Sequence, residues 1–272
     1  MHADSEGIDV ERADLERVLA AIARPAIAVS GGVDSLTLAV VAAHVIPDVM
    51  VFHATSPAVP AEATERVKRF AGQYGWTLTV VDAGEFADAA YRANPVNRCF
   101  HCKTNLYRTI RDCTDRPILS GANIDDLGEY RPGLDAARQH GVRHPYVETG
   151  LTKAHVRKIA RSFGLHGVAE LPASPCLSSR VETGIRIEAS TLSFVHDVEA
   201  LVTRALSPAT VRCRVRANAI VIELDALTFA ALSHTDRDRL ANDIAERSHR
   251  PGGLPIAFAE YRNGSAFLVE RP

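Results

Sequence analysis

The sequence predicts a doubly wound α/β fold followed by a smaller α+β domain. Through the first two thirds of the chain, short apolar runs rich in Val and Ile alternate with helical patterns. Such alternation is typical of parallel strands covered by helices on both faces. After about residue 186 the pattern changes to a helix, a hairpin-like pair of alternating segments and a further helix. We therefore expect two domains, residues 1–185 and residues 186–272.

The expected elements follow from this pattern in chain order, and the opening residues read as an amphipathic helix. Strands of the parallel sheet are expected at 26–29, 49–54, 78–81 and 117–121, with helices at 35–46, 60–74, 99–113 and 152–163. In the second domain we expect a helix at 188–206, a hairpin at 210–225, a helix at 235–248 and a strand pair near 255–269, with the connection at 172–186.

Composition restricts the class of protein. The chain has 272 residues, of which 46% are hydrophobic, and this is enough to bury one large or two modest cores. A net charge of -2 gives no support to a nucleic-acid partner. No apolar run reaches the roughly 18 residues of a membrane span, and the acidic start lacks signal-peptide order. Five cysteines, an odd number, favour reduced thiols, so we expect a cytoplasmic protein without a membrane partner.

The segment SGGVDS, residues 30–35, separates the first expected strand from the first helix of the sheet region. Gly31 and Gly32 allow backbone N–H groups to converge on an anion, and the helix N-terminus adds a favourable dipole. Ser30 and Ser35 can donate hydroxyl groups to phosphate, and Asp34 can hold Mg²⁺ or orient the loop. The segment lacks the Gly-Lys-Ser/Thr of a Walker A motif and the third glycine of a dinucleotide fingerprint. Gly-Gly alone would indicate only a plain βα turn.

The full string resembles the pyrophosphate-binding loop of the PP-loop ATP pyrophosphatase superfamily, whose fold is adenine nucleotide α-hydrolase-like. The resemblance implies that ATP is cleaved between its α and β phosphates and that an oxygen of the substrate is adenylated. It also implies ATP contacts at His53 and Ala54, which end the second strand, and at Gly121 and Asn123 of the SGAN segment (120–123), which ends a later strand. A helix beginning after Thr152, its expected N-cap, is common in these enzymes.

Cysteines form a second group of candidate residues. Cys99 and Cys102 lie at i and i+3 of a helical pattern, so both thiolates can share a metal. The pair alone leaves zinc, redox, iron–sulfur and incidental roles open. Cys176 stands in a loop rich in Pro and Ser, where a filler thiol is less expected, whereas Cys113 is expected in the apolar core. Cys99, Cys102 and Cys176 could bind three irons of a 4Fe–4S cluster and leave the fourth iron open for sulfide.

The segment VRCRVR places Arg212, Arg214 and Arg216 on one face of an expected strand. A solvated charged face is the ordinary interpretation of such a pattern. Three neighbouring guanidinium groups repel one another, however, and an anionic ligand would relieve the repulsion. Cys213 lies on the opposite face, where we expect it to be buried.

Four segments together resemble the LarE family, sulfur transferases that build the nickel-pincer nucleotide cofactor of lactate racemase. They are SGGVDS (30–35), EYRPGLDAA (129–137), ASPCLSSR (173–180) and VRCRVRANAIVIELD (211–225). The resemblance covers nearly the whole chain. It implies that ATP with Mg²⁺ adenylates a carboxylate of pyridinium-3,5-biscarboxylic acid mononucleotide, and that sulfur then displaces AMP to give a thiocarboxylate.

The resemblance also implies residue roles. Cys176 matches the sulfur-handling cysteine, which one branch of the family sacrifices. A second branch adds a Cys-x-x-Cys pair associated with a sulfide-delivering 4Fe–4S cluster, and Cys99 and Cys102 resemble that pair.

The resemblance further implies a homo-oligomer and allows a separate sulfide donor. The C-terminal AEYRNGSAF departs from the expected Gly-Gly-Phe-Arg type, so Arg262 has no assigned role. Substrate contacts are implied at Arg131, Ser179, Arg180, Arg212 and Arg214.

Three other functions are compatible with parts of the pattern. PP-loop tRNA thiolation enzymes also combine this loop with three cluster cysteines, but they need a basic surface for RNA. Ammonia-using pyrophosphatases of the NAD or GMP synthase type do not explain Cys176 or the YRPG segment. A non-catalytic ATP-binding sensor would have the loop without forming pyrophosphate.

Overall fold

The computed structural model describes residues 2–128, 130–172, 174–247 and 249–267, with side chains from Val10 onward. The first residues of the EYRPGLDAA and ASPCLSSR segments, Glu129 and Ala173, lie outside the described residues, as does the end of the strand expected near 269.

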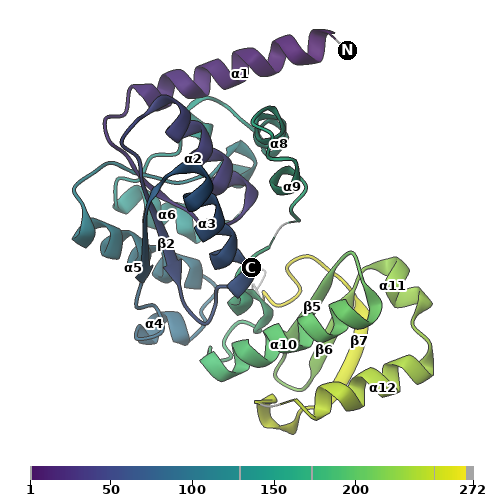
Figure 1. The fold of residues 1–272 in the computed structure, drawn as a ribbon. Helices are drawn as coiled ribbons and strands as arrows, with labels where there is room; N and C mark the ends of the chain where they lie inside the picture. The colour runs from purple at the N-terminus through teal and green to yellow at the C-terminus, as the bar shows by residue number, and fades with distance from the viewer. Residues whose placement is uncertain (1, 129, 173, 248, 268–272) are drawn as a thin grey trace. The chain divides into compact units, whose positions relative to one another are not determined.

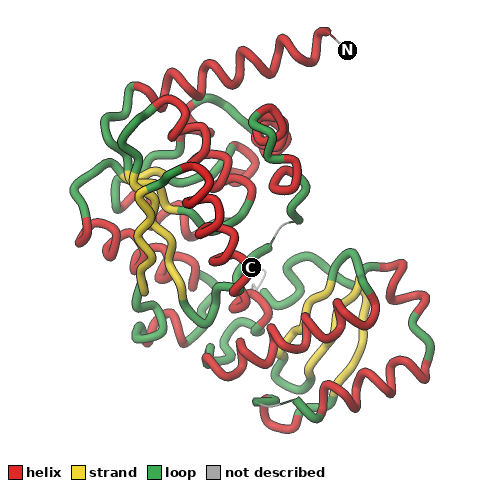
Figure 2. The backbone as a smooth tube through the Cα atoms, in the orientation of Figure 1, coloured by secondary structure: helices red, strands yellow, loops and turns green. Residues whose placement is uncertain are grey.

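The chain forms two compact units, each of which contains one sheet (Figure 2). The first comprises Met1–Glu85 and Cys99–Ser174, and the second comprises Phe86–Arg98 and Pro175–Pro272. The division differs from the boundary expected at residue 185, because residues 86–98 and 175–185 cluster with the second unit. The two units are defined by contacts between residues in space, whereas the expected boundary was placed where the sequence pattern changes.

Four parallel strands make up the sheet of the first unit, as the sequence predicts for an α/β protein. They are β1 (Ala26–Ala28), β2 (Met50–Thr55), β3 (Thr77–Asp82) and β4 (Ile118–Leu119), in the order β3-β2-β1-β4. β4 is shorter than the expected strand at 117–121. Its two residues pair with β1, where Ala26 lies opposite Ile118.

Helices cover both faces of this sheet. The hydrophobic cluster on one face draws on α1, α2, α3, α8 and α9, and the cluster on the other face draws on α5 and α6. Their bounds are α1 His2–Ala20, α2 Val33–Val45, α3 Ala61–Tyr74, α5 Arg98–Cys113, α6 Pro132–Gln139, α8 Lys153–Ser162 and α9 His166–Ala169; the short α7 (Pro145–Glu148) and the 3₁₀ helix η1 (Ile124–Gly128) lie between α5 and α8 in sequence.

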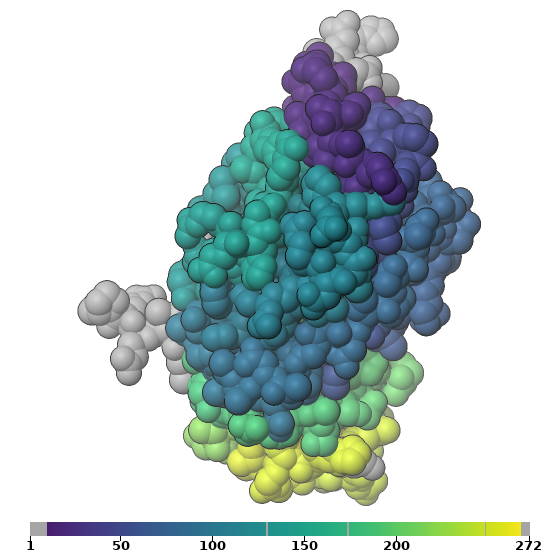
Figure 3. Space-filling model, turned by 90° about the vertical axis from the view of Figure 1, so that its left-hand side faces the viewer, coloured from purple at the N-terminus to yellow at the C-terminus, as the bar shows by residue number. Residues whose placement is uncertain are grey.

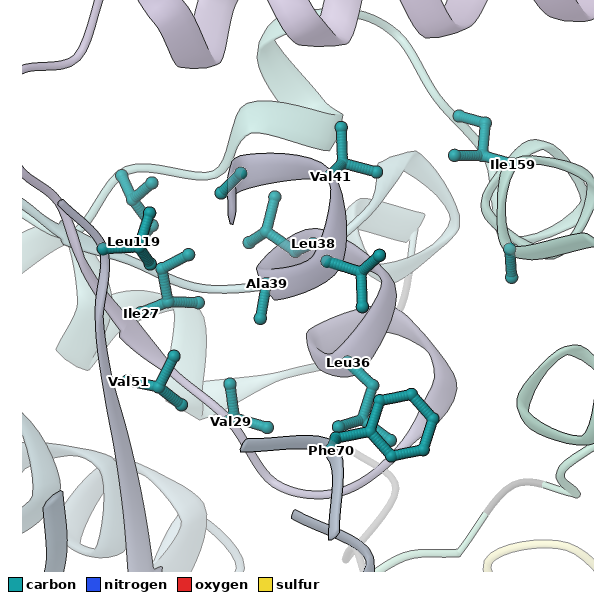
Figure 4. Packing of buried hydrophobic residues seen from close by; sticks show 14 of the residues in the cluster. Ile27, Val29, Leu36, Leu38, Ala39, Val41, Val51, Phe70, Leu119 and Ile159 are labelled. Carbon is teal, nitrogen blue, oxygen red and sulfur yellow. The ribbon is translucent and has the colours of Figure 1, made fainter. Parts of the chain in front are cut away.

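The larger core lies between the sheet and α2 (Figure 4). Ile27 of β1 and Val51 of β2 face Leu38 and Ala39 of α2, and all four side chains are fully buried. Neighbouring β1 residues, such as Ala28, contribute to the cluster on the other face. Both faces of β1 are therefore buried, and this is the physical reason for its unbroken apolar sequence.

The first helix lies on the surface of the first unit. It packs against α2, α7 and α8, and Figure 3 shows its purple surface beside teal residues. Leu15 and Leu19 are fully buried, whereas Val10 is 63% exposed. The inward positions are four residues apart, the spacing expected for one face of an amphipathic helix.

The second unit has a three-stranded mixed sheet in the order β5-β6-β7. β5 (Val211–Val215) and β6 (Ile220–Leu224) form the predicted antiparallel hairpin, and β7 (Ile256–Glu260) pairs parallel with β6. Of the strand pair expected near 255–269, the described residues to 267 contain one strand, β7, which pairs with β6 of the hairpin. The helices are α4 (Ala89–Arg92), α10 (Ala189–Leu206), α11 (Ala226–Ala231) and α12 (His234–Ala245), with 3₁₀ helices η2 (Leu177–Arg180) and η3 (Pro251–Gly253).

Asn94 joins the segment 86–98 to the rest of the second unit. It is fully buried with φ +54°, and its amide Nδ2 donates to the backbone carbonyls of Glu182 and Ile185 at 2.8 and 2.9 Å. Arg98 donates in turn to Asn94 Oδ1 at 2.6 Å. A buried side-chain amide that donates hydrogen bonds to several backbone carbonyls holds together two segments that are distant in sequence.

Two cysteine expectations have opposite outcomes. Cys213 is fully buried, as predicted, and burial raises the pKa of its thiol well above its usual range. The expectation that Cys113 lies in the core is wrong, because Cys113 is exposed. Its helical spacing matches that of the buried Leu106 and Ile110, but it is the last residue of α5, where the helix leaves the core.

No helix within the described ranges is long and apolar enough to cross a membrane.

Candidate functional site

The SGGVDS loop joins β1 to α2, whose N-cap is Gly32. The loop closes on itself, because the Ser30 backbone N–H donates to Ser35 Oγ at 3.1 Å and the two serine Oγ atoms lie 3.2 Å apart. Ser30 is exposed and Ser35 is buried. The loop thus stands at the carboxyl end of a parallel strand, which is where open α/β sheets bind ligands.

Gly31 is the residue whose conformation shapes this loop. Its φ is +84°, and a Cβ atom at this position would lie 2.8 Å from the carbonyl oxygen of Ala63 in α3. Arg66, also in α3, donates from Nη1 to the Gly31 carbonyl at 2.8 Å. Helix α3 therefore holds the loop, a role that the sequence did not suggest for Arg66.

Gly121 also packs against the loop. A Cβ atom on Gly121 would lie 2.9 Å from the Asp34 carbonyl carbon and 2.9 Å from the Ser35 nitrogen. The resemblance to the PP-loop superfamily implies that this glycine lets backbone approach a nucleotide. In the structure it lets the segment after β4 approach the first turn of α2, so Gly121 has a packing role within the protein.

Asp34 has three protein partners that the sequence did not predict as a group. Its carboxylate forms an ion pair with Lys153 Nζ and accepts from Asn123 Nδ2 at 3.4 Å. Its backbone carbonyl accepts from Tyr146 Oη at 3.0 Å. Burial and the Asp34 charge raise the pKa of Tyr146 well above its usual range. Lys153 begins α8 directly after Thr152, whose side chain caps the helix as predicted.

Lys153 could have been suspected from composition, because only four of the 31 Lys and Arg residues are lysines. It supplies an ammonium group beside the loop, where a phosphate would need a cation.

His53 is a buried residue beneath the loop. It is 1% exposed, with Nδ1 2.8 Å from the Val29 carbonyl oxygen and Nε2 2.9 Å from Thr64 Oγ1. Because a carbonyl only accepts, Nδ1 carries the proton and Nε2 accepts from the threonine. Burial lowers the pKa of His53. The side chain is therefore neutral and internally bonded, while the neighbouring Ala54 packs against the second core cluster.

Stability should depend on pH through His53. Since the folded pKa lies below the unfolded value of 6.5, the unfolded state binds more protons under mildly acidic conditions. The free energy of unfolding should therefore fall as pH drops below about 6.5, by at most about 1.4 kcal/mol per pH unit for one such group. Denaturant unfolding between pH 5 and 7 measures this slope.

The matched variants separate His53 from the other histidines. His53→Gln should reduce the slope, whereas His234→Gln, at an exposed position, should leave it unchanged. Equal slopes in wild type and His53→Gln would contradict the assignment of a neutral buried imidazole.

Arg131 and Asn123 meet through Asp126. Arg131 Nη2 lies 2.9 Å from Asp126 Oδ1, and the backbone N–H of Asn123 donates to Asp126 Oδ2 at 3.0 Å. The side chain of Arg131 is 48% exposed. The Asp126 carboxylate therefore connects Asn123, in the segment after β4, to Arg131 of the YRPG segment.

Cys99 and Cys102 lie on α5, and both are half-buried. The glycine of YRPG packs on this part of the helix: a Cβ atom on Gly133 would lie 3.1 Å from Lys103 Cγ and 3.7 Å from the Cys99 carbonyl oxygen. Gly133 of the YRPG segment therefore packs against α5 at Cys99 and Lys103, on either side of Cys102 in sequence. This relation could not be read from the spacing of the motif.

In the second unit, Cys176 is the N-cap of η2, and its side chain is half-buried. Ser179 and Arg180 follow within η2, and they are 5% and 3% exposed. The Arg180 guanidinium donates to both carboxylate oxygens of Glu199 at 2.9 and 3.0 Å. Two of the residues expected to contact substrate phosphate thus lie inside the protein, bonded to protein groups.

Arg214 and Arg216 of the predicted arginine face share a buried carboxylate. Arg214 Nε donates to Glu223 Oε2 at 2.8 Å, and Arg216 Nη2 donates to Oε1 at 3.2 Å. Ser265 Oγ adds a third bond at 2.6 Å. The expected repulsion between guanidinium groups is therefore relieved by Glu223 of β6, a residue that sequence spacing did not single out.

Arg212 is in a different environment from its two neighbours. It is half-buried, with Nη1 2.7 Å from the Val211 carbonyl oxygen and its guanidinium carbon 5.8 Å from the centre of the Tyr261 ring. Burial, together with the charges of Arg180 and Arg214, lowers the pKa of Arg212. An anion near Arg212 would offset this cost.

Replacing Glu223 by Gln should strongly destabilise the protein. The variant leaves the 4%-exposed Arg214 without its counter-charge, and breaking such buried pairs costs about 3–5 kcal/mol. Glu170→Gln, which removes the exposed partner of Arg161, should leave the melting temperature unchanged within error. Thermal unfolding of both variants checks this; equal melting temperatures would contradict the importance assigned to Glu223.

Among the described residues, no three His, Cys, Asp or Glu side chains gather as a metal site. Cys99 and Cys102 belong to the first unit and Cys176 to the second. The helical pair alone fits two ligands of a shared metal, since residues at i and i+3 lie on the same face.

The four-stranded parallel sheet and its polar βα loop define an α/β protein compatible with a Rossmann-like PP-loop domain. No protein-family model matches the chain. An uncharacterised protein of Synechocystis, slr1717, is 36% identical over 216 residues, which are 78% of this chain and 80% of that protein. The chain therefore belongs to the same family as slr1717.

Two more distant relatives extend the comparison. The pyridinium-3,5-bisthiocarboxylic acid mononucleotide synthase of Lactiplantibacillus plantarum is 26% identical over 220 residues, 79% of each chain. The uncharacterised protein MJ0830 of Methanocaldococcus jannaschii is 25% identical over 203 residues, 73% of this chain and 77% of that protein.

Proposed function

We propose that this protein is an ATP-dependent sulfur transferase of the LarE type, acting on a carboxylated pyridinium mononucleotide. The observation that supports this most directly is the distant relationship to a synthase of the bisthiocarboxylic acid mononucleotide, over 79% of the chain. The segments that resemble the LarE family extend over both units, so the proposal concerns the whole chain and not the ATP loop alone.

The first proposed step is adenylation. The substrate carboxylate attacks the α phosphorus of ATP, pyrophosphate leaves, and an acyl-adenylate forms. Ser30, Gly31, Gly32 and Ser35 would bind the phosphates, with Asp34 on Mg²⁺. Asp34 is paired with Lys153, so Mg²⁺ bound to this carboxylate would free the ammonium for a phosphate.

The adenine would lie near the ends of β2 and β4. We propose that His53 acts there through its position beneath the loop, because both ring nitrogens are bonded to protein atoms. Ala54 and Asn123 are the proposed neighbours of the nucleotide. Gly121 would contribute by keeping the first turn of α2 in place.

Substrate binding is proposed at Arg212 and Arg131. Arg212 has a lowered pKa beside two other guanidinium groups, so a phosphate there would be stabilised. Arg131 is half-exposed next to the nucleotide segment. The polar groups of Ser179, Arg180 and Arg214 are bonded inside the second unit. We propose that these three residues contribute to the shape of the substrate site.

The second proposed step is sulfur transfer. A sulfur nucleophile attacks the acyl carbon of the adenylate, the C–O bond to AMP breaks, and AMP leaves. Cys176 is the proposed sulfur-handling residue. Cys99, Cys102 and Cys176 would hold a 4Fe–4S cluster, which when bound would supply exchangeable sulfide. We propose a homo-oligomer, served by a separate sulfide donor.

Adenylation is tested by measuring AMP and pyrophosphate formed from ATP with and without the mononucleotide substrate. We expect both products in equal amounts, and Asp34→Asn should suppress them by at least about 10-fold because Mg²⁺ loses its ligand. Asp14→Asn, on an exposed ion pair of α1, is the control. If Asp34→Asn formed AMP at the wild-type rate, Asp34 would have no role in adenylation. If the wild-type protein formed no AMP, the proposed function would be refuted.

The sulfur source is tested by iron and acid-labile sulfide content of anaerobically purified protein. About four irons per chain, lost in Cys99→Ala, would support the cluster. Iron-free protein after reconstitution would instead assign the transferred sulfur to Cys176 itself. The chain mass should then fall by one H₂S after a single turnover, as the cysteine becomes dehydroalanine.

A further inference from the structure

The residues that follow Cys176 are each held by a different part of the second unit. Ser178 Oγ lies 2.6 Å from Tyr91 Oη, and the Ser179 carbonyl accepts from Arg214 Nη1 at 3.1 Å. Leu177 is 4% exposed. These contacts hold the backbone that follows Cys176 in place, and with it the attachment point of the Cys176 side chain.

The Arg180 side chain contacts the cysteine backbone directly. Its Nη1 donates to the Pro175 carbonyl at 2.7 Å and to the Cys176 carbonyl at 3.3 Å. The guanidinium is planar, so its orientation is set by the groups at its other nitrogens. Those nitrogens, Nε and Nη2, both donate to the Glu199 carboxylate.

Glu199 has a second function in this arrangement. Its Oε1 also accepts from the backbone N–H of Cys213 at 2.9 Å, on the edge strand β5. One carboxylate on α10 therefore connects the loop of Cys176 to the strand that carries Arg212 and Arg214. Its own side chain is 14% exposed, which limits competition from water.

Removing the Glu199 charge would change this arrangement in a defined way. Arg180 would remain as a buried cation beside Arg212, whose pKa is already lowered in part by the Arg180 charge. The uncompensated guanidinium would turn toward solvent or toward another acceptor. In either case the Pro175 and Cys176 carbonyls would lose the Arg180 donor, while the Cys176 carbonyl would keep its bond from the Ser179 amide.

We propose that Glu199 is a positioning residue, which acts through Arg180 to hold Cys176 in the geometry that sulfur transfer requires. The inference rests on the proposed function, because it takes Cys176 as the sulfur-handling residue. It goes further by assigning a role to a carboxylate that no sequence motif identified. It also assigns Arg180 to positioning Cys176, a role other than binding the substrate phosphate.

The test compares Glu199→Gln with Glu188→Gln in the full-length reduced protein. Glu188 is a matched control, because it is the N-cap residue of the same helix, α10, and pairs with Arg92 and Arg186 instead of Arg180. The first measurement is the alkylation rate of Cys176 by iodoacetamide relative to exposed Cys113, read by peptide mass spectrometry. The second is hydrogen exchange of the Ser179 amide, which donates to the Cys176 carbonyl at 2.9 Å.

In Glu199→Gln we expect the Cys176/Cys113 alkylation ratio to rise about threefold or more, since the loop opens locally, and Ser179 exchange to accelerate. Glu188→Gln should match wild type in both. If Glu199→Gln does not fold, the double variant Glu199→Gln/Arg180→Gln removes both charges together, and the same rise is expected in it. An unchanged ratio and unchanged Ser179 exchange in the folded variant would overturn the proposal.

The activity measurement separates this inference from the proposed function. In Glu199→Gln, kcat for thiocarboxylate formation should fall about 10-fold, because a misplaced nucleophile reacts slowly. The ATP-to-AMP rate and the KM for ATP should stay near wild type. A wild type without transferase activity would refute the proposed function while the alkylation and exchange results still decide whether Glu199 positions Cys176. If Glu199→Gln lost AMP formation as well, Glu199 would support the site as a whole. That result would count against a role in positioning Cys176.

Discussion

Replacing Cys176 by Ser is expected to abolish thiocarboxylate formation while AMP and pyrophosphate continue to form within about twofold of the wild-type rate. The hydroxyl group of serine is close in size to the thiol, so η2 and its contacts should be preserved. Adenylation uses the SGGVDS loop of the first unit and requires no sulfur. The expected result is therefore a separation of the two half-reactions, with the acyl-adenylate lost to hydrolysis.

Cys113→Ser is the control for this experiment, because Cys113 is exposed at the end of α5 and has no proposed role. It should retain both activities. Both products are measured in one anaerobic reaction, with AMP by chromatography and thiocarboxylate by mass. Thiocarboxylate from Cys176→Ser at the wild-type rate would show that sulfur reaches the adenylate without this residue, and would exclude the proposed second step.

The second large effect is expected from Gly31→Ala, which should destabilise the protein and suppress ATP cleavage. The added Cβ would lie 2.8 Å from a backbone oxygen of Ala63, and the residue would have to adopt a φ of +84°. Left-handed backbone costs a non-glycine residue about 1–2 kcal/mol, and overpacking adds about 1–3 kcal/mol. We expect the free energy of unfolding to fall by about 2–5 kcal/mol.

The adjacent glycine provides the control. Gly32 has φ −84°, and a Cβ atom there would meet only Ser30 Oγ, at 3.5 Å. Gly32→Ala should therefore cost about 1 kcal/mol or less, the amount expected for losing glycine at an N-cap. Urea unfolding and AMP formation measure both variants. Equal stability of the two variants would show that α3 does not constrain the loop as the structure indicates.

Local sequence was sufficient for most of the framework. Four strands and the helices between them were predicted because apolar periodicity is a local property of the chain. The hairpin of β5 and β6 and the burial of Cys213 followed from alternation alone. The prediction for Cys113 was wrong for a related reason: periodicity shows which face of a helix a residue occupies, but does not show where along the helix the core ends.

The candidate site was predictable only in part. Chemistry-bearing segments such as SGGVDS stand out, because their residue types are unusual for a strand or a helix. The partners of those residues do not stand out. From the sequence, Arg180 and Arg214 were expected to contact substrate and Arg216 to lie on a charged face. In the structure each is paired with a carboxylate from another element.

The sequence by itself determined the order of elements, the position of the loop between β1 and α2, and the residues available for catalysis. Only the tertiary structure decided which charges are paired and which backbone is held. Asp34 and Lys153 are 119 positions apart, and Arg180 and Glu199 lie on different helices. Such pairs form when packing brings two elements together and removes water between them, and neither condition is encoded in local spacing.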